Sequence, residues 1–239
     1  MNINIWVAVA LTLGLALAWL RINDFMAHRG WISGPLSRKI IHIGTGPIFV
    51  LCWLLFPDQP AARYLAALVP GAITVQFAAV GLGLMKDQAA VDAMSRHGDR
   101  REILRGPLFY GIVFVVMTIL FWKDSPIGII ALMLLCGGDG LADIVGKRFG
   151  HAGRLPWSPN KSWAGSLAML LGGWLFTVLV LAVFLAAGVF SGSLMDYLPG
   201  ISLIALVGAA AESLPVNDID NLTVPALAVF LGWLMLPKG

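Results

Sequence analysis

The chain has few charged residues, and this shortage excludes an ordinary soluble domain. Only 12% of its 239 residues are Asp, Glu, Lys or Arg, whereas 59% are hydrophobic and the mean hydropathy is +0.85. A typical globular domain carries about twice that share of charge. We therefore expect residues 1–239 to form a single membrane-embedded domain.

Cysteines and the common catalytic motifs are also scarce. Cys52 and Cys136 both lie in apolar runs, where a thiol normally packs rather than forming a disulfide or binding metal. The sequence lacks a Walker-type glycine loop, a protein-kinase signature, a nucleophile elbow and a zinc motif. The net charge of +3 is small and no basic stripe is visible, so we expect no nucleic-acid partner.

Long apolar runs occupy most of the chain. Because a membrane-spanning helix needs roughly 20 apolar residues, these runs predict an all-α membrane bundle of about eight transmembrane helices, with seven as the alternative. We expect the spans near residues 3–20, 40–56, 64–84, 107–122, 126–146, 164–190, 200–215 and 222–236. The first run has neither the basic start nor the cleavage site of a targeting peptide, so we expect it to remain as a membrane anchor.

Most cations fall on one side of this predicted topology. Loops 21–39, 85–106 and 147–163 hold 13 of the 16 Lys and Arg residues: Arg21, Arg29, Arg38, Lys39, Lys86, Arg96, Arg100, Arg101, Arg105, Lys147, Arg148, Arg154 and Lys161. Only Arg63, Lys123 and Lys238 remain for the other side. Because cytoplasmic loops are enriched in Lys and Arg, we expect these loops to face the cytoplasm or stroma and both termini to face outward.

Residues 137–165, GGDGLADIVGKRFGHAGRLPWSPNKSWAG, interrupt the apolar pattern with carboxylates, glycines and cations. On a helix, Asp139 and Asp143 would share one face, with Lys147 one turn further on. Carboxylates at that spacing can hold a hard metal ion through oxygen. The same stretch offers phosphate-binding donors and glycines that permit close backbone approach: Lys147, Arg148, Lys161, Ser162, Gly138, Gly140, Gly146 and Gly165.

Asp139 and Glu212 follow unusually short charge-free runs. Residues 126–138 form a run of 13 and residues 197–211 a run of 15, both too short to cross a full hydrocarbon core. Either each helix continues past its acid, which places a carboxylate within the membrane boundary, or it breaks there. Both outcomes favour a functional polar site over a purely structural ion pair, since intramembrane ionisable groups normally face a cavity and a partner.

Three further polar clusters lie on the same predicted face. Residues 212–221 contribute Glu212, Asp218, Asp220 and Asn221, which we interpret as a second wall of the metal site. Residues 38–42 contribute Arg38, Lys39 and His42, which are either site residues or membrane anchors with a helix-packing histidine. Residues 101–105 contribute Arg101 and Arg105, suited to phosphate contact or to snorkelling.

As an ordered set, the motifs of this chain resemble those of phytol kinases. The motifs are RKIIHIGTG, RGPLFY, SPIG, GGDGLAD, KSWAGS, ESLP and DNLTVP, spread from Arg38 to Pro225. Phytol kinases are polytopic prenol kinases of plastids and cyanobacteria, and the chain is similar, more distantly, to dolichol and farnesol kinases. The resemblance implies a kinase in a bacterial or cyanobacterial membrane that uses CTP and Mg²⁺ to phosphorylate phytol or a related isoprenoid alcohol.

The resemblance also implies roles for individual residues. It makes 137–165 with 212–221 the nucleotide and metal region, with Asp139, Asp143, Lys147 and Lys161 catalytic, and Asp139, Asp143, Glu212, Asp218, Asp220 and Asn221 on the metal. The nucleotide side comprises Arg38, Lys39, His42, Arg101, Arg105, Gly138, Gly140, Gly146, Ser162 and Gly165. Asp139 is favoured as acceptor of the alcohol proton. Ile219 interrupts the consecutive aspartates expected before Asn221, which leaves the roles of Asp218 and Asp220 open.

Two rival functions remain. The pattern from Asp139 to Gly165 also resembles the nucleotide region of CTP:phosphatidate cytidylyltransferases, which implies a common CTP-binding core. Those enzymes end with a basic-acidic and His-Gly signature, whereas this chain has ESLPVNDIDN, which favours the kinase. A membrane transporter is the third hypothesis, because paired short spans are natural in that class. The sequence leaves the length of the alcohol and the oligomeric state open.

Overall fold

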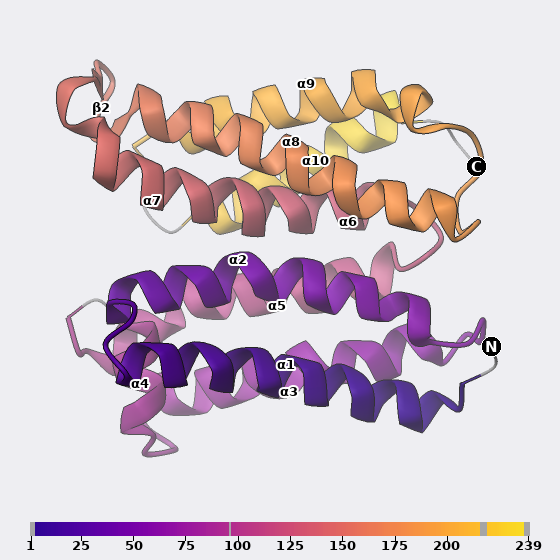
Figure 1. Cartoon of the computed structure of the whole chain (residues 1–239), viewed down its shortest axis with the longest axis horizontal. Coiled ribbons are helices and arrows are strands. Elements are labelled where there is room, and N and C mark those ends of the chain that lie inside the picture. Colours follow the sequence, from indigo (N-terminus) through magenta and orange to yellow (C-terminus); the bar gives the residue numbers. More distant parts are fainter. Residues whose placement is uncertain (1–2, 96, 216–218, 237–239) are drawn as a thin grey trace.

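Long helices that run side by side between two ends make up the molecule (Figure 1). The computed structural model describes residues 3–95, 97–215 and 219–236. The long elements are α1 (Ile5–His28), α2 (Gly34–Cys52), α3 (Ala62–Leu82), α5 (Gly106–Leu120), α6 (Ile127–Met133), α7 (Asp139–Phe149), α8 (Trp163–Ala186), α9 (Leu194–Glu212) and α10 (Asp220–Met235). The short ones are α4 (Gln88–Met94), η1 (Trp53–Leu55), η2 (Arg100–Leu104), η3 (Leu134–Gly138), η4 (Gly150–Ala152), β1 (Arg154–Leu155) and β2 (Ser158–Ser162).

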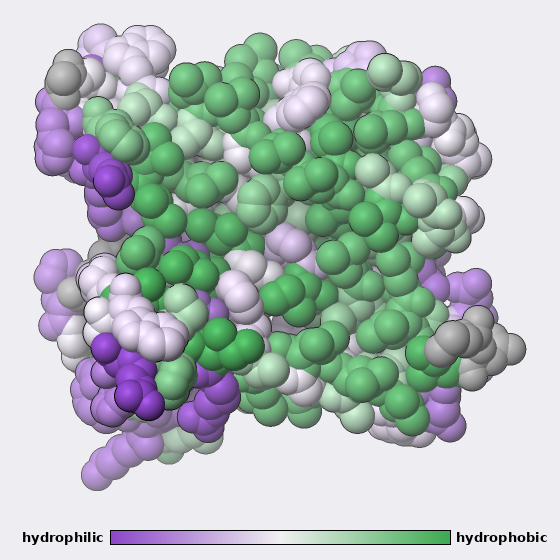
Figure 2. All heavy atoms as spheres, viewed as in Figure 1, coloured by the Kyte–Doolittle hydropathy of each residue, from purple (hydrophilic) through white to green (hydrophobic). Residues whose placement is uncertain are grey.

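The lengths and surfaces of the helices are those of a membrane protein. Within the described residues, seven helical segments are long and apolar enough to cross a bilayer, and α10 is apolar but shorter, with 16 residues. Leu167, Leu171, Leu175 and Leu179 form an exposed stripe along α8, as expected of a lipid-facing side. Hydrophobic residues cover most of the middle of the face seen in Figure 2. The predicted all-α membrane bundle is therefore confirmed.

The start of α1 and the end of α10 lie at the same end of the bundle, on the right in Figure 1. The α1–α2 connection, α4, the β1–β2 hairpin and the start of α10 lie at the opposite end. This is the alternation expected if α10 traverses the bundle like the longer helices. Figure 2 shows hydrophilic residues gathered at that left-hand end. The predicted basic loops therefore share one end of the molecule.

The boundaries near the basic loops differ from those predicted. Helix α1 continues to His28 rather than ending near residue 20, and α2 begins at Gly34 rather than near residue 40. Pro35 occupies the first turn of α2, where its missing N–H leaves no intrahelical bond unmade. Arg38 and Lys39 consequently lie on a helix rather than in a loop.

The segments α6, η3 and α7 form one continuous helical span, Ile127–Phe149, and it is the most deeply buried of the spans. All seven residues of α6 are buried, as expected of a helix that is apolar on every side. The π-helical turn η3 follows, and such turns occur often at functional sites. Asp139 comes directly after it, so this helix continues past its acid. Glu212 instead ends α9.

A two-stranded hairpin connects α7 to α8 and departs from the predicted loop. Strands β1 and β2 pair antiparallel, with Arg154 opposite Ser162. Leu155, Ser158 and Ser162 are buried, and the Ser162 side chain accepts a hydrogen bond from the Gly165 N–H at the start of α8. The hairpin thus fixes the position of Lys161, which precedes this cap.

The contact between α7 and α8 depends on glycine. A Cβ atom at Gly172 would lie 2.8 Å from the Gly137 carbonyl oxygen and 2.7 Å from Leu141. We expect Gly172→Ala to lower the free energy of unfolding by about 1–3 kcal/mol, because the backbone oxygen cannot move aside cheaply. Gly14→Ala, where nothing lies within 4 Å, is the matched control and should be neutral or stabilising. Thermal unfolding in detergent measures both; equal effects would contradict this packing.

Candidate functional site

Three carboxylates from three helices meet near the hydrophilic end of the bundle. Asp139 begins α7, Glu212 ends α9 and Asp220 begins α10, and one oxygen of each lies within 4.8 Å of the others. Their side chains are 25%, 8% and 17% exposed. They line a small cavity together with Leu135, Met169, Asn221 and Val224. Carboxylate and amide oxygens are ligands that hard divalent cations prefer.

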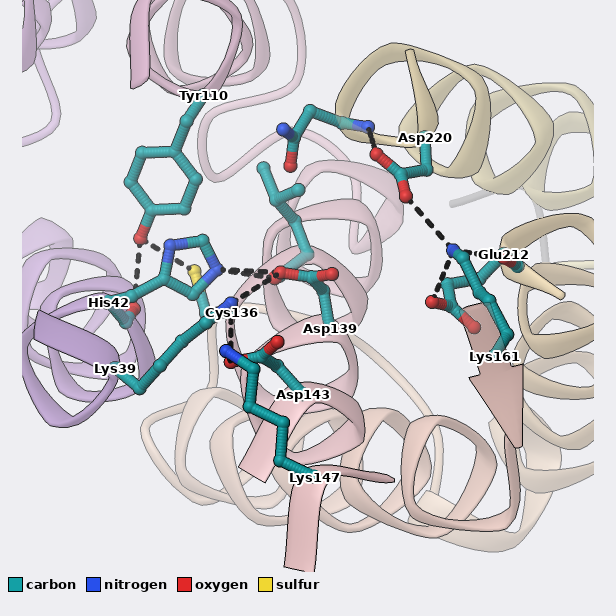
Figure 3. Close-up of polar contacts among 12 residues, drawn as sticks. Lys39, His42, Tyr110, Cys136, Asp139, Asp143, Lys147, Lys161, Glu212 and Asp220 are labelled. Carbon is teal, nitrogen blue, oxygen red and sulfur yellow. Dashed lines mark hydrogen bonds and ion pairs between the residues drawn. The ribbon is translucent and has the colours of Figure 1, made fainter. Parts of the chain in front are cut away.

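Lys161 holds two of these carboxylates together (Figure 3). Its Nζ donates to Glu212 Oε1 at 2.5 Å, to Asp220 Oδ2 at 3.1 Å and also to the Glu212 carbonyl oxygen. Burial opposes the charged ammonium, but Glu212 and Asp220 outweigh it and raise the pKa of Lys161 above its usual value. The ammonium therefore stays charged and supplies a positive charge inside the acidic cluster.

Helix α2 brings two more cationic or polar groups to Asp139. Lys39 Nζ lies 3.6 Å from Asp139 Oδ2, and His42 Nε2 lies 3.3 Å from the same oxygen. His42 Nε2 also lies 3.1 Å from the Leu135 carbonyl oxygen. Because both neighbours are acceptors, Nε2 must carry the hydrogen. His42 therefore packs between helices, as one interpretation predicted, and its ring also contacts Asp139 of the carboxylate cluster.

Asp143 lies outside the cluster of three. Its Oδ2 accepts from Lys147 Nζ at 2.8 Å and lies 3.6 Å from Lys39 Nζ. The Lys147 side chain is 67% exposed, so this is a surface pair between helical positions four apart. The predicted Asp139–Asp143 face exists, and both carboxylates contact Lys39 (Figure 3), but only Asp139 also has an oxygen within 4.8 Å of those of Glu212 and Asp220.

The remaining predicted site residues lie on several different elements. Arg38 donates to the Ser95 carbonyl oxygen at 2.7 Å, which ties α2 to the α4 region. Arg105 precedes α5 as its N-cap residue, and Arg101 lies in η2. Asn221 lines the carboxylate cavity. Asp218 lies outside the described residues.

The glycines predicted to admit a phosphate are instead covered by protein atoms. A Cβ atom at Gly138 would meet Met169, and one at Gly140 would meet Ile43. Gly146 and Gly165 face each other across the α7–α8 contact. These glycines therefore let helices approach closely around the carboxylates, and their immediate surroundings leave no room for a ligand at the Cβ positions.

Tyr110 and Cys136 lie behind His42, and the sequence did not predict either of them as a site residue. The Tyr110 hydroxyl donates to the His42 carbonyl oxygen at 3.0 Å and lies 3.1 Å from Cys136 Sγ. The rings of His42 and Tyr110 lie 4.4 Å apart. Tyr110 is the last residue of the RGPLFY motif, in which only Arg105 was predicted to be a site residue. Its position on a mainly apolar helix was the available signal, because a buried tyrosine hydroxyl needs a partner.

The site combines hard oxygen ligands with fixed cations at a membrane edge. The first half of the chain supplies Lys39, His42 and Tyr110, and the second half supplies the carboxylates and Lys161. Such an arrangement can bind a divalent cation and the oxygens of a phosphorylated ligand.

Comparisons with known proteins point to one family. The chain is 40% identical over 222 residues to a probable chloroplastic phytol kinase of Triticum aestivum, covering 92% of this chain and 74% of that protein. It is 35% identical over 229 residues to the chloroplastic phytol kinase 1 of Arabidopsis thaliana, covering 95% and 75%. It is 40% identical over 233 residues to the chloroplastic farnesol kinase of Arabidopsis thaliana, covering 95% and 74%.

No family model and no solved structure matches the chain. The similarity to the plant proteins nevertheless extends over 92–95% of this chain. On this similarity, the chain belongs to the phytol kinase family.

Proposed function

We propose that the protein is a CTP-dependent kinase that transfers the γ-phosphoryl group of CTP to the hydroxyl of phytol or a related isoprenoid alcohol. The observation that carries this proposal is the three-carboxylate cluster beside Lys161 and Lys39, in a chain 35–42% identical to proteins named phytol and farnesol kinases. Phosphoryl transfer depends chiefly on positioning and on neutralising charge, which such a site supplies.

The carboxylate cluster fits a magnesium ion. Asp139, Glu212 and Asp220 offer only hard oxygen atoms, and Asn221 adds an amide beside the same cavity. The ammonium of Lys161 already lies between Glu212 and Asp220, so this position favours positive charge. Asp139, Glu212 and Asp220 would hold Mg²⁺ there, and the bound ion would supply positive charge to neutralise the nucleotide phosphates.

The cations around the cluster are suited to the triphosphate. Lys39 reaches the carboxylates from α2, and Lys161 reaches them from the hairpin. Lys147 is more exposed and pairs with Asp143 instead. On this proposal Lys161 releases Glu212 and Asp220 when a divalent cation occupies the cluster, and its ammonium is then free to contact a nucleotide phosphate. The choice of CTP rests on family resemblance, and Arg105 at the start of α5 remains the candidate for an outer phosphate contact.

The reaction needs one proton acceptor for the alcohol. The alcohol oxygen forms a bond to the γ-phosphorus while the bond from that phosphorus to the bridging oxygen of CDP breaks. The hydroxyl proton passes to a carboxylate, and Asp139 is the candidate. His42 Nε2, 3.3 Å from Asp139 Oδ2, would orient this carboxylate toward the alcohol.

The position of the site suits an acceptor with a long hydrocarbon tail. We propose that the basic end faces the cytoplasm or stroma, where CTP is available, because cations concentrate on that side of membrane proteins. The alcohol would place its hydroxyl at the cluster and its tail among the apolar helices.

The product distinguishes this function from the rival cytidylyltransferase. With purified protein, Mg²⁺, phytol and CTP labelled in the γ-phosphate, we expect labelled phytyl phosphate and unlabelled CDP. Thin-layer chromatography of the organic phase measures the transfer. Release of the label as pyrophosphate, with a CDP-linked lipid as product, would contradict the kinase proposal.

Removing charge from the cluster should abolish turnover without unfolding the protein. We expect Asp139→Asn and Glu212→Gln each to lower kcat by about 100-fold or more, the scale of losing a group that stabilises transition-state charge. Asp92→Asn on α4, whose carboxylate accepts a hydrogen bond only from its helical neighbour Gln88 among the contacts described, is the control and should retain activity. Near-normal rates for Asp139→Asn or Glu212→Gln would remove that residue from the proposed site.

If a metal ion replaces the ammonium of Lys161 in the cluster, removing Lys161 should change the stability of the protein in a way that depends on the metal. Lys161→Met leaves Glu212 and Asp220 without their shared cation, so the metal-free protein should lose about 3 kcal/mol of unfolding free energy. Mg²⁺ should then raise the melting temperature of this variant more than that of the unmodified protein. Lys147→Met, at an exposed pair, is the control and should change little. A loss that Mg²⁺ does not reduce would contradict the exchange.

A further inference from the structure

Two tryptophans are exposed where the hairpin meets α8, at the hydrophilic end of the bundle (Figure 1). Trp157 lies between β1 and β2 and is 48% exposed, and Trp163 begins α8 and is 57% exposed. Their rings pack edge to face, with centroids 5.5 Å apart. Exposed apolar groups that gather on one surface mark a place where a membrane or another molecule is contacted.

The position of Trp163 on α8 identifies what this surface contacts. Trp163 lies one helical turn before the exposed stripe of leucines, which begins at Leu167. Side chains four residues apart lie on the same side of a helix, so Trp163 continues the lipid-facing side of α8 to the hydrophilic end. Tryptophan rings concentrate at this level of membrane proteins, where the ring meets acyl chains and the N–H meets polar groups. The partner is therefore the bilayer at the level of its headgroups.

Two exposed arginines, on the hairpin and just before it, give this region a positive charge. The guanidinium of Arg154 on β1 donates to the Asn160 carbonyl oxygen at 3.2 Å. The guanidinium of Arg148, near the end of α7, lies 5.6 Å from the centre of the Phe149 ring, which is 65% exposed. In the part of the chain that the structure describes, neither guanidinium forms an ion pair with a carboxylate. Both therefore keep N–H donors for phosphate oxygens.

The hairpin joins this surface to the carboxylate site. The Trp157 indole N–H donates to the Ser213 hydroxyl oxygen at 3.2 Å, and Ser213 directly follows Glu212. Lys161, on β2 of the same hairpin, donates to the Glu212 carboxylate. When a divalent cation displaces this ammonium, as proposed above, the hairpin loses that contact. Contacts on its outer side then contribute more to keeping Lys161 near the nucleotide.

We propose that Arg148, Phe149, Arg154, Trp157 and Trp163 form one surface, the hairpin surface, that binds the headgroup of an anionic phospholipid and so keeps the hairpin positioned for catalysis. Charge complementarity selects the lipid, because guanidinium groups attract a headgroup of net negative charge more strongly than a zwitterionic one. The lipid site does not depend on the proposed function, whereas its effect on turnover rests on that function.

Native mass spectrometry of the whole protein, mixed with equal amounts of phosphatidylglycerol and phosphatidylcholine, tests the lipid site without turnover. The unmodified protein should retain phosphatidylglycerol in preference. Arg154→Gln should lower this preference about 5-fold, the effect of removing one cation near an anionic headgroup. Arg154→Lys keeps the charge and should keep most of the preference, which separates the loss of charge from a loosened hairpin.

Arg29→Gln is the matched control, because Arg29 is also exposed, lies at the same end of the bundle and has its guanidinium 5.1 Å from the centre of the Phe25 ring. It should leave the lipid preference unchanged. Equal losses for Arg154→Gln and Arg29→Gln would reduce the effect to overall charge and overturn the inference, as would equal retention of both lipids by the unmodified protein. A stable dimer without retained phosphatidylglycerol would assign the surface to a second copy of the chain and also overturn it.

The effect on catalysis is measured in nanodiscs of phosphatidylcholine with and without phosphatidylglycerol. The anionic lipid should lower the KM for CTP about 3-fold or more, because a fixed hairpin presents Lys161 to the triphosphate, and Arg154→Gln should lose most of this response. If Arg154→Gln raised the KM equally in both lipids, Arg154 would contact the nucleotide rather than a lipid, and the inference would be overturned. If the unmodified protein phosphorylates no alcohol, the proposed function fails, while mass spectrometry still decides the lipid site.

Discussion

The site depends on keeping three like charges together inside a hydrophobic bundle. At separations within 4.8 Å and an effective dielectric constant of about 20, each pair of ionised carboxylates repels by at least about 3.5 kcal/mol. The cluster is stable because hydrogen-bond donors and positive charges reach it from other elements: the ammonium of Lys161 from the hairpin, and the ammonium of Lys39 and the imidazole N–H of His42 from α2. The same excess of negative charge is what makes the position suitable for a divalent cation.

This electrostatic requirement explains the less regular parts of the fold. Glu212 and Asp220 lie at helix ends, and Asp139 follows a π-helical turn, so each carboxylate lies where regular helix stops or changes. The hairpin between α7 and α8 carries Lys161 to the cluster. Glycines at the α7–α8 and α2–α7 contacts bring these elements close enough for the side chains to meet. The remaining helices provide a hydrophobic frame around the site.

Much of this was predictable, because hydrophobic runs and their interruptions are local properties of the sequence. The bundle and the shared end of the basic loops followed from run lengths and charge positions, and the same positions singled out Asp139 and Glu212, whose carboxylates lie close together in the structure. The separation of Asp143 from the cluster did not, because helical spacing gives the shared face but not which neighbours lie opposite it. The glycines predicted for phosphate contact lie where helices approach closely, a packing role that depends on tertiary neighbours and not on local sequence. The hairpin and the Tyr110–Cys136 contact depend on tertiary pairing that no local pattern specifies.

The central claim is that one divalent cation binds between Asp139, Glu212 and Asp220 and displaces the ammonium of Lys161. Anomalous diffraction from crystals grown with Mn²⁺ tests it most directly. The account predicts a single strong peak among these three carboxylates, with Lys161 no longer between Glu212 and Asp220. A peak beside Asp143 and Lys147 instead, with Lys161 still bridging Glu212 and Asp220, would contradict it.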